Sequence, residues 1–566
     1  MVAPVLTVKD TAADRPSPVT RGSTLRAPVL AGALLLGVYL ALSCFMSPRG
    51  FLGTDTGGKV ATVEVMSERG DFDPDVGYWA APWDPDGRVH GLYYTSRLGD
   101  RYLQVTSLPM VLLARPLWDL GGYRATLLLP MLGGVATAFA ARALARRLAP
   151  GEGWTAFWVI GLASPVAVYA LDLWEHSLGL ALMGWAGVAL FDAVERRPTW
   201  RRGLGAGLLF GAAAAMRTEA FVYAFAMIGV ACVAITFGRH RSLRAGALVG
   251  ASAIAGFALA FGANLALETA VVGEQIRSSR AGGAAVSGGS QALVRVQEAM
   301  TTLVSPYSGA GMSTWVIGGA LAALVIYGAR KATQPHGERQ AALAASLVVA
   351  IYLTRLLGGL GFVPGMIAAT PFAAVGLALG RRAHPARLVL LMGLAPLPFV
   401  FAFQYVGGAG PQWAGRYLLT SGLLLAVVGI AEARRMLPWA RVSVVVASVV
   451  ITAFGMGWLA VRSHAVAEAG AHLAERPEEV LISPNGFLPR EFGVTYGDHH
   501  WLSSGTAADL DFAVRVAGDS GAATFGLVVV APTTTPPAFP GWSADRSEEF
   551  DFLAGSVLRV TTYIRR

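Results

Sequence analysis

Charged residues are scarce in this chain. Asp, Glu, Lys and Arg make up 14% of its 566 residues, whereas 54% of the residues are hydrophobic. In soluble globular domains about one residue in four is charged. The shortage of charge therefore excludes an ordinary soluble protein and indicates a chain that crosses a membrane many times.

Cysteine is almost absent, and no internal repeat is obvious. The two cysteines, Cys44 and Cys232, both fall inside apolar segments. They exclude a disulfide framework and leave the redox compartment undetermined. The lack of an obvious repeat argues against a transporter, because many transporters are built from repeated halves with binding sites near the middle of the membrane.

The first long apolar segment runs from Ala27 to Met46 without a charge. About 20 residues suffice to cross a hydrocarbon core of roughly 30 Å as a helix. The segment is too long for the apolar region of a signal peptide, and no small-residue cleavage site follows it. We therefore expect a true span here, preceded by a cytoplasmic tail over residues 1–27.

Further apolar runs follow along the chain, separated by polar breaks. Together with the first segment they predict a polytopic α-helical membrane domain over residues 28–461, with about thirteen transmembrane helices. After the first, these runs lie near residues 122–145, 154–171, 177–194, 203–216, 219–237, 244–267, 313–329, 341–357, 360–380, 387–405, 416–432 and 440–461.

Lys and Arg alternate between the loops. Basic residues gather around residues 142–147, 196–202, 239–244, 330–339, 381–387 and 434–441, whereas the intervening short loops carry almost none. Cytoplasmic loops carry the excess of Lys and Arg. The alternation therefore predicts a cytoplasmic amino terminus and an extracytoplasmic carboxyl terminus. The high usage of Ala, Gly and Arg is typical of a high-GC bacterium, so we expect a bacterial plasma membrane.

Three predicted outer segments are long enough to carry a function: residues 47–121, 268–312 and 462–566. The second is rich in Gly, Ser and Ala and fits either a flexible lid or a disordered linker. The third predicts a small α/β domain, with a helix from residue 462 and strands at 480–483, 526–530 and, at an edge, 557–564. A further helix is expected at residues 507–517.

Acidic and aromatic side chains gather in the first outer loop, residues 47–121. Carboxylates beside aromatic faces suit a groove that handles sugars. The same mixture would also fit an interfacial belt of Trp and Tyr next to a solvated acidic loop. The loop includes Asp55, Glu64, Glu68, Asp71, Asp73, Asp75, Asp84, Asp86, Asp100, Tyr78, Trp79, Trp83, Tyr93, Tyr94 and Tyr102.

Asp55 lies just past the first span, in the segment Gly-Thr-Asp-Thr-Gly-Gly-Lys at residues 53–59. Its position suggests a catalytic carboxylate at the membrane surface. The alternative is a structural one, because Asp is a favoured N-cap residue of a helix. If a helix begins here, Lys59 shares a face with Asp55 and either tunes it, touches a phosphate or forms a plain surface ion pair.

Other charged groups lie at predicted outer ends of spans. Asp172, Glu175 and His176 form one such group, and Arg217 with Glu219 forms a second. A charged side chain that faces lipid costs about 2.5–3.5 kcal/mol at mid-membrane, so we expect a polar cavity beside them. A solvated loop end would be the plain alternative.

Arg416 and Tyr417 open a span from the predicted outer side. The excess of positive charge inside the cell does not explain an arginine there. Its planar guanidinium suits phosphate oxygens, and an interfacial anchor is the alternative role.

The order of several short motifs along residues 28–461 resembles one family. An acidic residue follows the first span, and a long outer loop ends in Leu-Pro before the next span. The motifs are Leu108-Pro109, Gly121-Gly122-Tyr123-Arg124, Leu162-Ala163-Ser164-Pro165, Trp174-Glu175-His176-Ser177 and Gly415-Arg416-Tyr417-Leu418-Leu419. This pattern resembles the GT-C superfamily of integral-membrane glycosyltransferases, including mannosyl- and arabinosyltransferases, which take sugars from polyprenyl-phosphate carriers at the outer face.

The resemblance implies a hexosyl- or pentosyltransferase that builds an envelope glycan or glycolipid. Asp55 would be the general base, and the donor phosphate would meet Lys59, Arg217, Arg416 and Tyr417. The acceptor would lie near the remaining polar side chains of the site. These are Asp172, Glu175, His176 and Glu219.

The implied partners are a polyprenyl-phosphate-linked sugar donor, a glycan or lipid acceptor and membrane lipids, without nucleic acid. Many family members carry two adjacent acids, but Thr56 follows Asp55 here. A divalent metal therefore stays open, and no other cofactor is implied. Two other functions also stay open: a transporter or flippase for lipid-linked sugars, and a non-catalytic assembly protein in which Asp55 would be dispensable.

Overall fold

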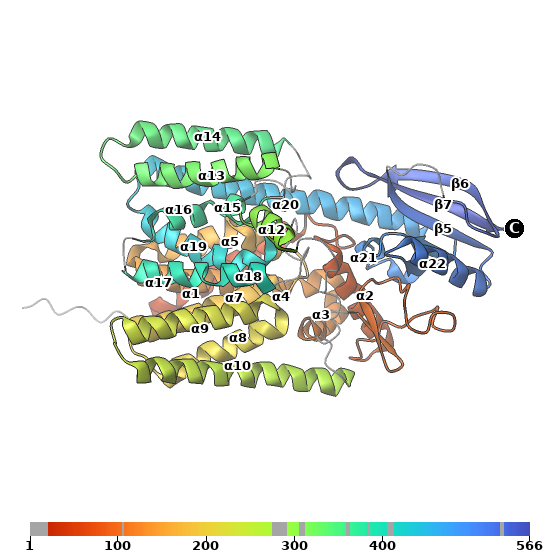
Figure 1. Cartoon of the computed structure of the whole chain (residues 1–566), viewed down its shortest axis with the longest axis horizontal. Helices are drawn as coiled ribbons and strands as arrows, with labels where there is room; N and C mark the ends of the chain where they lie inside the picture. Colours follow the sequence, from red (N-terminus) through yellow and green to blue (C-terminus); the bar gives the residue numbers. More distant parts are fainter. Residues whose placement is uncertain are drawn as a thin grey trace, which may run out of the picture.

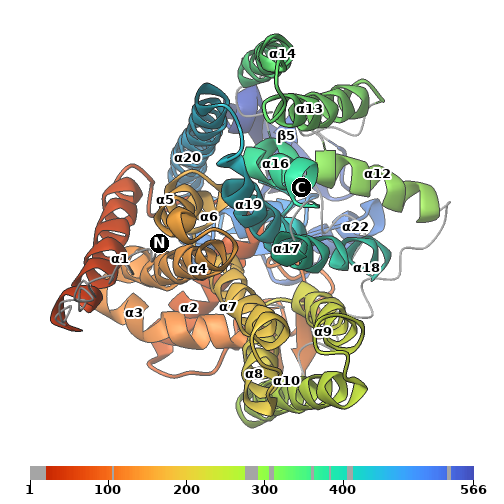
Figure 2. The same cartoon turned by 90° about the vertical axis from the view of Figure 1, so that its left-hand side faces the viewer.

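The computed structural model describes residues 21–104, 107–273, 291–304, 312–357, 363–381, 384–403, 412–531 and 537–566. Most of these residues form helices that run side by side in one bundle, and a sheet domain lies beyond one end of the bundle (Figure 1). Figure 2 views the molecule from the opposite end, with α1 (Arg21–Ser43) at one flank of the bundle.

The bundle has helices wherever the sequence predicts spans within the described residues. Several predicted spans are broken helices, such as α5 followed by α6. After α1, the bundle contains α4 (Leu128–Leu148), α5 (Gly153–Leu162), α6 (Pro165–Tyr169), α7 (His176–Glu195), α8 (Trp200–Met216), α9 (Glu219–Phe237), α10 (Leu243–Val272), α13 (Met312–Lys331), α14 (Glu338–Leu356), α15 (Met366–Ala369), α16 (Pro371–Leu379), α17 (His384–Leu394), α18 (Pro396–Phe403), α19 (Leu419–Ala433) and α20 (Pro438–Ala474).

In the described part of the chain, eight helical segments are long and apolar enough to cross a membrane. They are α1, α4, α7, α9, α10, α17 together with α18, α19 together with the preceding 3-10 turn η3 (Arg416–Leu418), and α20. The predicted fold class, a polytopic helical membrane protein with a small carboxyl-terminal α/β domain, is confirmed. The number of about thirteen spans stays a prediction.

The arginine-bearing connections meet at the end of the bundle away from the sheet domain. His384 Nδ1 lies 3.2 Å from Glu195 Oε1, and Arg239 donates to the Glu195 carbonyl at 3.3 Å. Arg441 pairs with Glu152 at 2.7 Å. These contacts join the ends of α7 and α9 to the start of α17, and the start of α5 to the start of α20. The connections at residues 170–175 and 217–218 lie at the end that carries the sheet domain, where Arg217 Nη1 is 2.9 Å from Glu175 Oε1.

The long helix α20 connects the bundle to the sheet domain without a break. It has 37 residues and continues to Ala474. The helix predicted from residue 462 is therefore the end of α20, not a separate element. Its last turns present Val466, Ala469 and Leu473 to the sheet, so the domain packs on the final helix of the bundle.

The sheet domain has five strands in the order β4-β3-β5-β7-β6. The strands β4, β3 and β5 are parallel, and β7 is antiparallel to both β5 and β6. The domain contains β3 (Val480–Ser483), α21 (Leu488–Glu491), η4 (Tyr496–Asp498), β4 (His500–Ser503), α22 (Ala507–Asp519), β5 (Thr524–Ala531), β6 (Trp542–Asp551), η5 (Leu553–Gly555) and β7 (Val557–Arg565).

The prediction of residues 557–564 as an edge strand is wrong, because β6 pairs with β7 along its outer side. The sequence of β6 has exposed, largely charged residues through its middle and gives a weak strand signal. Alternate residues of the inner strands point to opposite faces. Val480 and Ile482 pack with α22, whereas Leu481 packs with α20.

The first outer loop packs between the bundle and the sheet domain. It forms α2 (Thr54–Arg69), the hairpin β1 (Thr95–Leu98) with β2 (Arg101–Gln104), and α3 (Leu108–Thr126). Trp79 Nε1 donates to the Trp501 carbonyl at 3.2 Å, and Ser503 N donates to the Val89 carbonyl at 2.9 Å. The predicted outer loop is therefore part of the folded structure at this end of the bundle.

The hairpin ends at Gln104, and α3 begins at Leu108. It is not among the eight candidate spans of the described residues. The predicted loop 268–312 lies partly outside the described residues: α10 extends to Val272, and α12 (Gln291–Val304) precedes α13. Its role as a lid or a linker stays a prediction.

Candidate functional site

Asp55 lies in the first turn of α2, at the end of the bundle that faces the sheet domain. The N-cap of α2 is Gly53, without a side-chain capping bond, so the N-cap hypothesis for Asp55 is wrong. The carboxylate instead binds two guanidinium groups. Its Oδ2 lies 2.7 Å from Arg416 Nη1, and its Oδ1 lies 3.1 Å from Arg490 Nη2. The Asp55 side chain is 36% exposed, which leaves it accessible.

A second, buried network lies beside Asp55. Lys59 Nζ is 2.8 Å from Glu175 Oε2, and Arg217 Nη1 is 2.9 Å from Glu175 Oε1. Arg217 Nε also lies 2.9 Å from Glu219 Oε1. No side chain of this network is more than 8% exposed. The alternative of a plain surface ion pair for Lys59 is therefore wrong, and so is that of a solvated loop end for Glu175.

Two aromatic rings connect the pair of networks. The Arg416 guanidinium lies 4.9 Å from the Tyr417 ring centroid, and the Arg217 guanidinium lies 5.2 Å from the same ring. Trp174 has Arg416 at 5.7 Å and Lys59 at 5.9 Å. A cation within about 6 Å of a ring centroid is attracted by the face of the ring. Tyr417 and Trp174 thus hold three cations in one cluster.

Asp172 anchors the start of α2. Its Oδ1 accepts from Leu52 N at 3.1 Å and from Tyr123 OH at 2.9 Å, and its Oδ2 accepts from the Thr56 hydroxyl. Burial raises the pKa of Asp172, against these hydrogen bonds. Because Leu52 and Thr56 flank Asp55 closely, Asp172 fixes the position of the Asp55 backbone. Asp172 therefore contacts the start of α2 and not the Asp55 carboxylate.

His176 is buried between aromatic rings. Its ring stacks on Tyr169 at a centroid distance of 4.9 Å and lies 4.5 Å from the Trp174 ring. Within the described part of the chain, neither ring nitrogen has a hydrogen-bond partner. A buried polar group without a partner is costly, so the position of His176 needs an explanation such as a bound water or a catalytic role.

The structure brings all the predicted site residues to one end of the bundle. It adds Arg490 from α21 and Trp174, which are not among the predicted site residues. The only sequence signal for Trp174 is the motif that also contains Glu175 and His176. Arg490 has no such signal, because it lies in a short helix of the sheet domain, 435 positions from Asp55.

The charges around the carboxylates set their protonation. Burial by itself would raise the pKa of Asp55, but Arg416, Arg490 and Lys59 outweigh burial and hold that pKa well below its usual range. Burial likewise opposes ionisation of Glu175, and Lys59 with Arg217 lowers its pKa to about 2. Both carboxylates are therefore ionised at neutral pH.

The carboxylates of this site do not fit a metal centre. Among the described residues, no three His, Cys, Asp or Glu side chains lie close enough to hold a metal ion. The oxygens of Asp55 and Glu175 are directed at cationic side chains instead. No step of the chemistry proposed below is therefore assigned to a metal.

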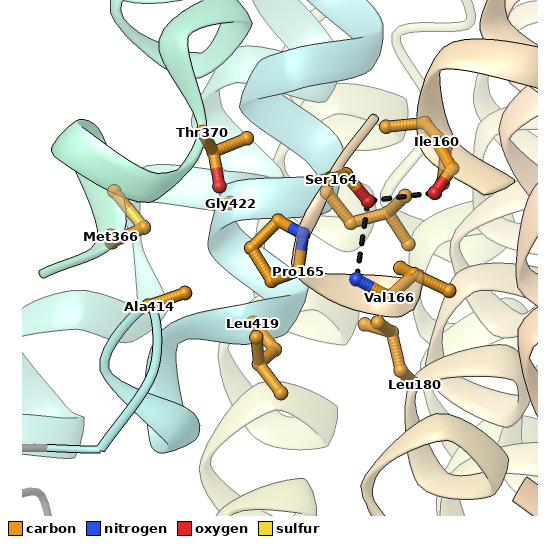
Figure 3. Close-up of a pocket in the computed structure, with 11 residues that line it drawn as sticks. Ile160, Ser164, Pro165, Val166, Leu180, Met366, Thr370, Ala414, Leu419 and Gly422 are labelled. Atoms are coloured by element: carbon orange, nitrogen blue, oxygen red, sulfur yellow. Dashed lines mark hydrogen bonds between the residues drawn. The ribbon is translucent and has the colours of Figure 1, made fainter. Parts of the chain in front are cut away.

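A small apolar cavity lies inside the bundle between α5, α6 and α7 on one side and α15 and α19 on the other (Figure 3). Ser164 borders it and donates to the Ile160 carbonyl at 2.7 Å, while accepting from Val166 N at 3.2 Å. The cavity has a volume of about 10 Å³, which is close to the space of a single water. It is too small for a sugar or a lipid chain.

Comparison with solved structures finds similar folds, whereas no family model and no curated protein sequence matches the chain. One similar structure is ArnT from Cupriavidus metallidurans in the apo state, with 14% identity and a TM-score of 0.45 over 95% of this chain and 98% of that chain. ArnT bound to undecaprenyl phosphate is also similar, with 14% identity and a TM-score of 0.43 over 93% and 97% of the two chains.

The Archaeoglobus fulgidus oligosaccharyltransferase in complex with Zn and sulfate is a third similar structure. It has 11% identity and a TM-score of 0.45, over 87% of this chain and 67% of that chain. Both proteins have the GT-C fold, the superfamily that the sequence motifs resemble. At these identities the likeness concerns the fold alone, and the roles of residues below rest on the contacts in this chain.

Proposed function

We propose that the protein is a membrane glycosyltransferase. It moves a sugar from a polyprenyl-phosphate donor to a glycan or lipid acceptor of the cell envelope, at the outer face of the membrane, and Asp55 is its general base. The observation that carries this proposal is the position of Asp55. Its carboxylate is accessible at the end of the bundle and is flanked by a cluster of cations.

The cation cluster suits a phosphate that arrives from the lipid side. Arg416 begins the apolar segment Arg416–Ala433, so its guanidinium lies where a helix leaves the bundle end. A guanidinium binds phosphate oxygens through paired N–H donors, and charge-assisted hydrogen bonds are about twice as strong as neutral ones. Lys59 and Arg217 add positive charge close by, and Glu175 fixes both of them. The donor phosphate is therefore proposed to bind at Arg416.

The proposed reaction is one displacement at the anomeric carbon of the donor sugar. The acceptor hydroxyl oxygen forms the new bond to that carbon, and its proton passes to Asp55. The bond between the anomeric carbon and the phosphate oxygen breaks, and the lipid phosphate leaves with the electron pair. A positioned carboxylate base contributes roughly 10²- to 10⁴-fold to such a step. Arg416 stabilises the charge on the departing phosphate.

The test is sugar transfer from a panel of polyprenyl-phosphate sugars into envelope lipid and glycan acceptors. Membranes would contain the wild type, Asp55→Asn or Glu68→Gln. Asparagine preserves the shape of aspartate but cannot take the proton. Glu68 is a matched control, because it is an exposed carboxylate of the same helix. We expect Asp55→Asn to lower transfer about 10²- to 10⁴-fold, and Glu68→Gln to leave it unchanged.

Equal transfer by the wild type and folded Asp55→Asn would remove the base role from Asp55. No transfer from any donor by the wild type would contradict the glycosyltransferase proposal. Movement of an intact lipid-linked sugar across vesicles would then be measured, because the alternative function is a flippase or transporter.

A further inference from the structure

The sheet domain reaches the site through Arg490. This residue belongs to α21, and its side chain is only 3% exposed. Its Nη2 lies 3.1 Å from Asp55 Oδ1, on the opposite carboxylate oxygen from Arg416. Arg490 is therefore a buried arginine of one domain that faces the proposed base of another part of the chain.

A backbone contact between α2 and α21 holds Arg490 in place. An added Cβ at Gly57 would lie 1.7 Å from the Arg490 carbonyl oxygen, and one at Gly493 would lie 2.3 Å from the Gly57 carbonyl oxygen. No side chain fits at either position, so the two backbones touch because both residues are glycine. Gly57 thus allows the close contact between α2 and α21, a role that the sequence alone does not reveal.

An ion pair fixes the same contact from the other side. Arg462 Nη2 donates to both carboxylate oxygens of Glu491, each at 2.7 Å. The Arg462 Nε also donates to the Leu52 carbonyl at 2.8 Å. Arg462 therefore joins α20, α21 and the segment before α2, and the position of Arg490 is set by the whole outer structure.

The Arg490 guanidinium is only partly satisfied. Within the described residues, its Nε and Nη1 are buried without a hydrogen-bond partner. Tyr94 covers the group at 6.0 Å from its ring centroid. A guanidinium has five N–H donors, and a buried charged donor without an acceptor is expensive. The geometry therefore points to an acceptor that is not part of the protein.

Asp55 by itself is a small acceptor for two arginines. Arg416 uses one of its oxygens and Arg490 the other. A phosphoryl group offers more oxygens and binds guanidinium groups through paired hydrogen bonds. An anion of this class would satisfy both arginines at once and would compete with Asp55 for them.

We propose that Arg490 is a second ligand of the donor phosphate, supplied by the carboxyl-terminal domain. Without a donor, Arg416 and Arg490 hold the Asp55 carboxylate. When the phosphate binds, it takes hydrogen bonds from both arginines and frees Asp55 for the acceptor hydroxyl. This inference rests on the proposed function, and it makes donor binding precede activation of the base.

The charges explain why the exchange matters. A carboxylate held by two arginines has a low pKa and is a weak base. Once the phosphate neutralises those arginines, the pKa of Asp55 rises and the carboxylate accepts a proton more readily. Binding of the donor phosphate thus increases the basicity of Asp55.

A binding experiment tests the ligand without requiring catalysis. Full-length protein in nanodiscs would be titrated with polyprenyl monophosphate, which carries no sugar, and with the neutral polyprenol. The variants are Arg490→Gln, Arg490→Lys and Arg416→Gln. Arg476→Gln is the matched control, because Arg476 is a buried, ion-paired arginine of the same domain that pairs with Glu478 at 2.8 Å, away from Asp55.

We expect Arg490→Gln to weaken binding of the phosphate lipid about 10- to 100-fold, from the strength of hydrogen bonds to charged groups. Polyprenol binding should not change, Arg490→Lys should lose less affinity, and Arg476→Gln should bind like the wild type. Wild-type affinity in folded Arg490→Gln would overturn the inference. If Arg416→Gln binds the phosphate lipid weakly while Arg490→Gln binds it like the wild type, the inference about Arg490 fails but the proposed function does not. A wild type that binds polyprenol as well as polyprenyl phosphate contradicts the proposed function itself.

Kinetics supply a second measurement that a purely structural role would not move. Loss of Arg490 removes one of the charges that lower the pKa of Asp55. In Arg490→Gln, the donor KM should rise about tenfold or more, and the acid limb of kcat/KM should move to higher pH, because kcat/KM reports the free enzyme. An unchanged donor KM and acid limb, with a loss in kcat alone, would contradict the assignment.

Discussion

The two ends of the helical bundle both contain arginine–carboxylate pairs with a buried glutamate, but the arginines of these pairs differ in exposure. At the end with the basic loops, Arg441 and Glu152 are 33% and 11% exposed. At the end with the candidate site, Arg217 and Glu175 are each 8% exposed. Exposed pairs contribute about 0–1 kcal/mol, whereas breaking a buried pair costs several kcal/mol. At the end with the candidate site, both partners of the pair are therefore shielded from water.

In the described part of the chain, buried polar atoms without a hydrogen-bond partner occur at both ends of the bundle, among them Arg142 Nε, Glu195 Oε1 and Glu432 Oε2 at the end with the basic loops, but they are more numerous near the site. Near the site, both nitrogens of His176, Nη2 of Arg217 and two nitrogens of Arg490 are buried without hydrogen-bond partners among the described residues. Most buried polar atoms in proteins have a partner. A group of buried polar atoms without partners beside Asp55 is consistent with a site that binds a polar ligand.

The largest expected effect is the loss of stability on substitution of Glu175. Glu175→Gln leaves Lys59 and Arg217 buried without their shared carboxylate, so we expect a loss of about 3–5 kcal/mol in stability and strongly reduced sugar transfer. At the other end, Glu152→Gln leaves only Arg441 without its partner, and because Arg441 is one-third exposed and reaches water, the cost should be about 0–1 kcal/mol. Thermal unfolding in detergent compares the two variants. Equal costs would show that burial does not distinguish the two ends.

The contact between α2 and α21 gives the next largest effect. Gly57→Ala places a methyl group against the Arg490 carbonyl, so we expect a cost of about 1–3 kcal/mol and a loss of phosphate-lipid affinity like that of Arg490→Gln. Gly37→Ala is the control, because an added Cβ there meets nothing within 4 Å. Unfolding curves and lipid titrations provide both values. Wild-type behaviour of Gly57→Ala would show that the two backbones can separate without effect.

A smaller effect is expected from the anchor of Asp55. Tyr123→Phe removes one of the hydrogen bonds to Asp172, and we expect a loss of about 0.5–1.5 kcal/mol with a modest reduction in transfer. Tyr352→Phe, which removes a hydrogen bond to the Ala368 carbonyl, should lower stability without lowering transfer per folded molecule. If both variants lose transfer equally, Asp172 has no special role in positioning Asp55.

The last effect appears only at high pH and concerns Glu64, a half-buried residue of α2. Burial, with Glu68 and Asp498 nearby, raises the pKa of Glu64 to about 7. The folded state then binds a proton that the unfolded state releases, so stability falls as pH rises from about 4.5 towards 7. Glu64→Gln should therefore raise Tm relative to the wild type at pH 8 and not at pH 4. Asp86→Asn, at an exposed carboxylate, is the control.

Much of the fold follows from local sequence. Long apolar segments and alternating basic loops predict where the helices lie and which connections share an end of the bundle. That alternation is enough to expect Asp172, Arg217 and Arg416 at the same end of the bundle. The strand β6 escapes prediction because its outward-facing residues are exposed and largely charged, and pairing with β7 decides its conformation.

The site itself is only half predictable. The sequence predicts the residue types of the site and the end of the bundle at which they lie, because buried charge at a span end is costly and needs partners. It does not predict which residues pair with one another. Asp55 and Lys59 share a helix, as predicted, yet Lys59 pairs with the Glu175 carboxylate and Asp55 pairs with Arg416 and Arg490.

The sequence by itself determined the membrane helices, their alternation and the set of charged side chains at one end. Hydrophobicity and loop charge are properties of neighbouring residues, so a linear reading can recover them. Only the tertiary structure decided that Asp172 anchors α2, that Gly57 touches α21 and that Arg490 reaches Asp55. Those contacts join residues more than a hundred positions apart, and side-chain packing, rather than any local pattern, sets their distances.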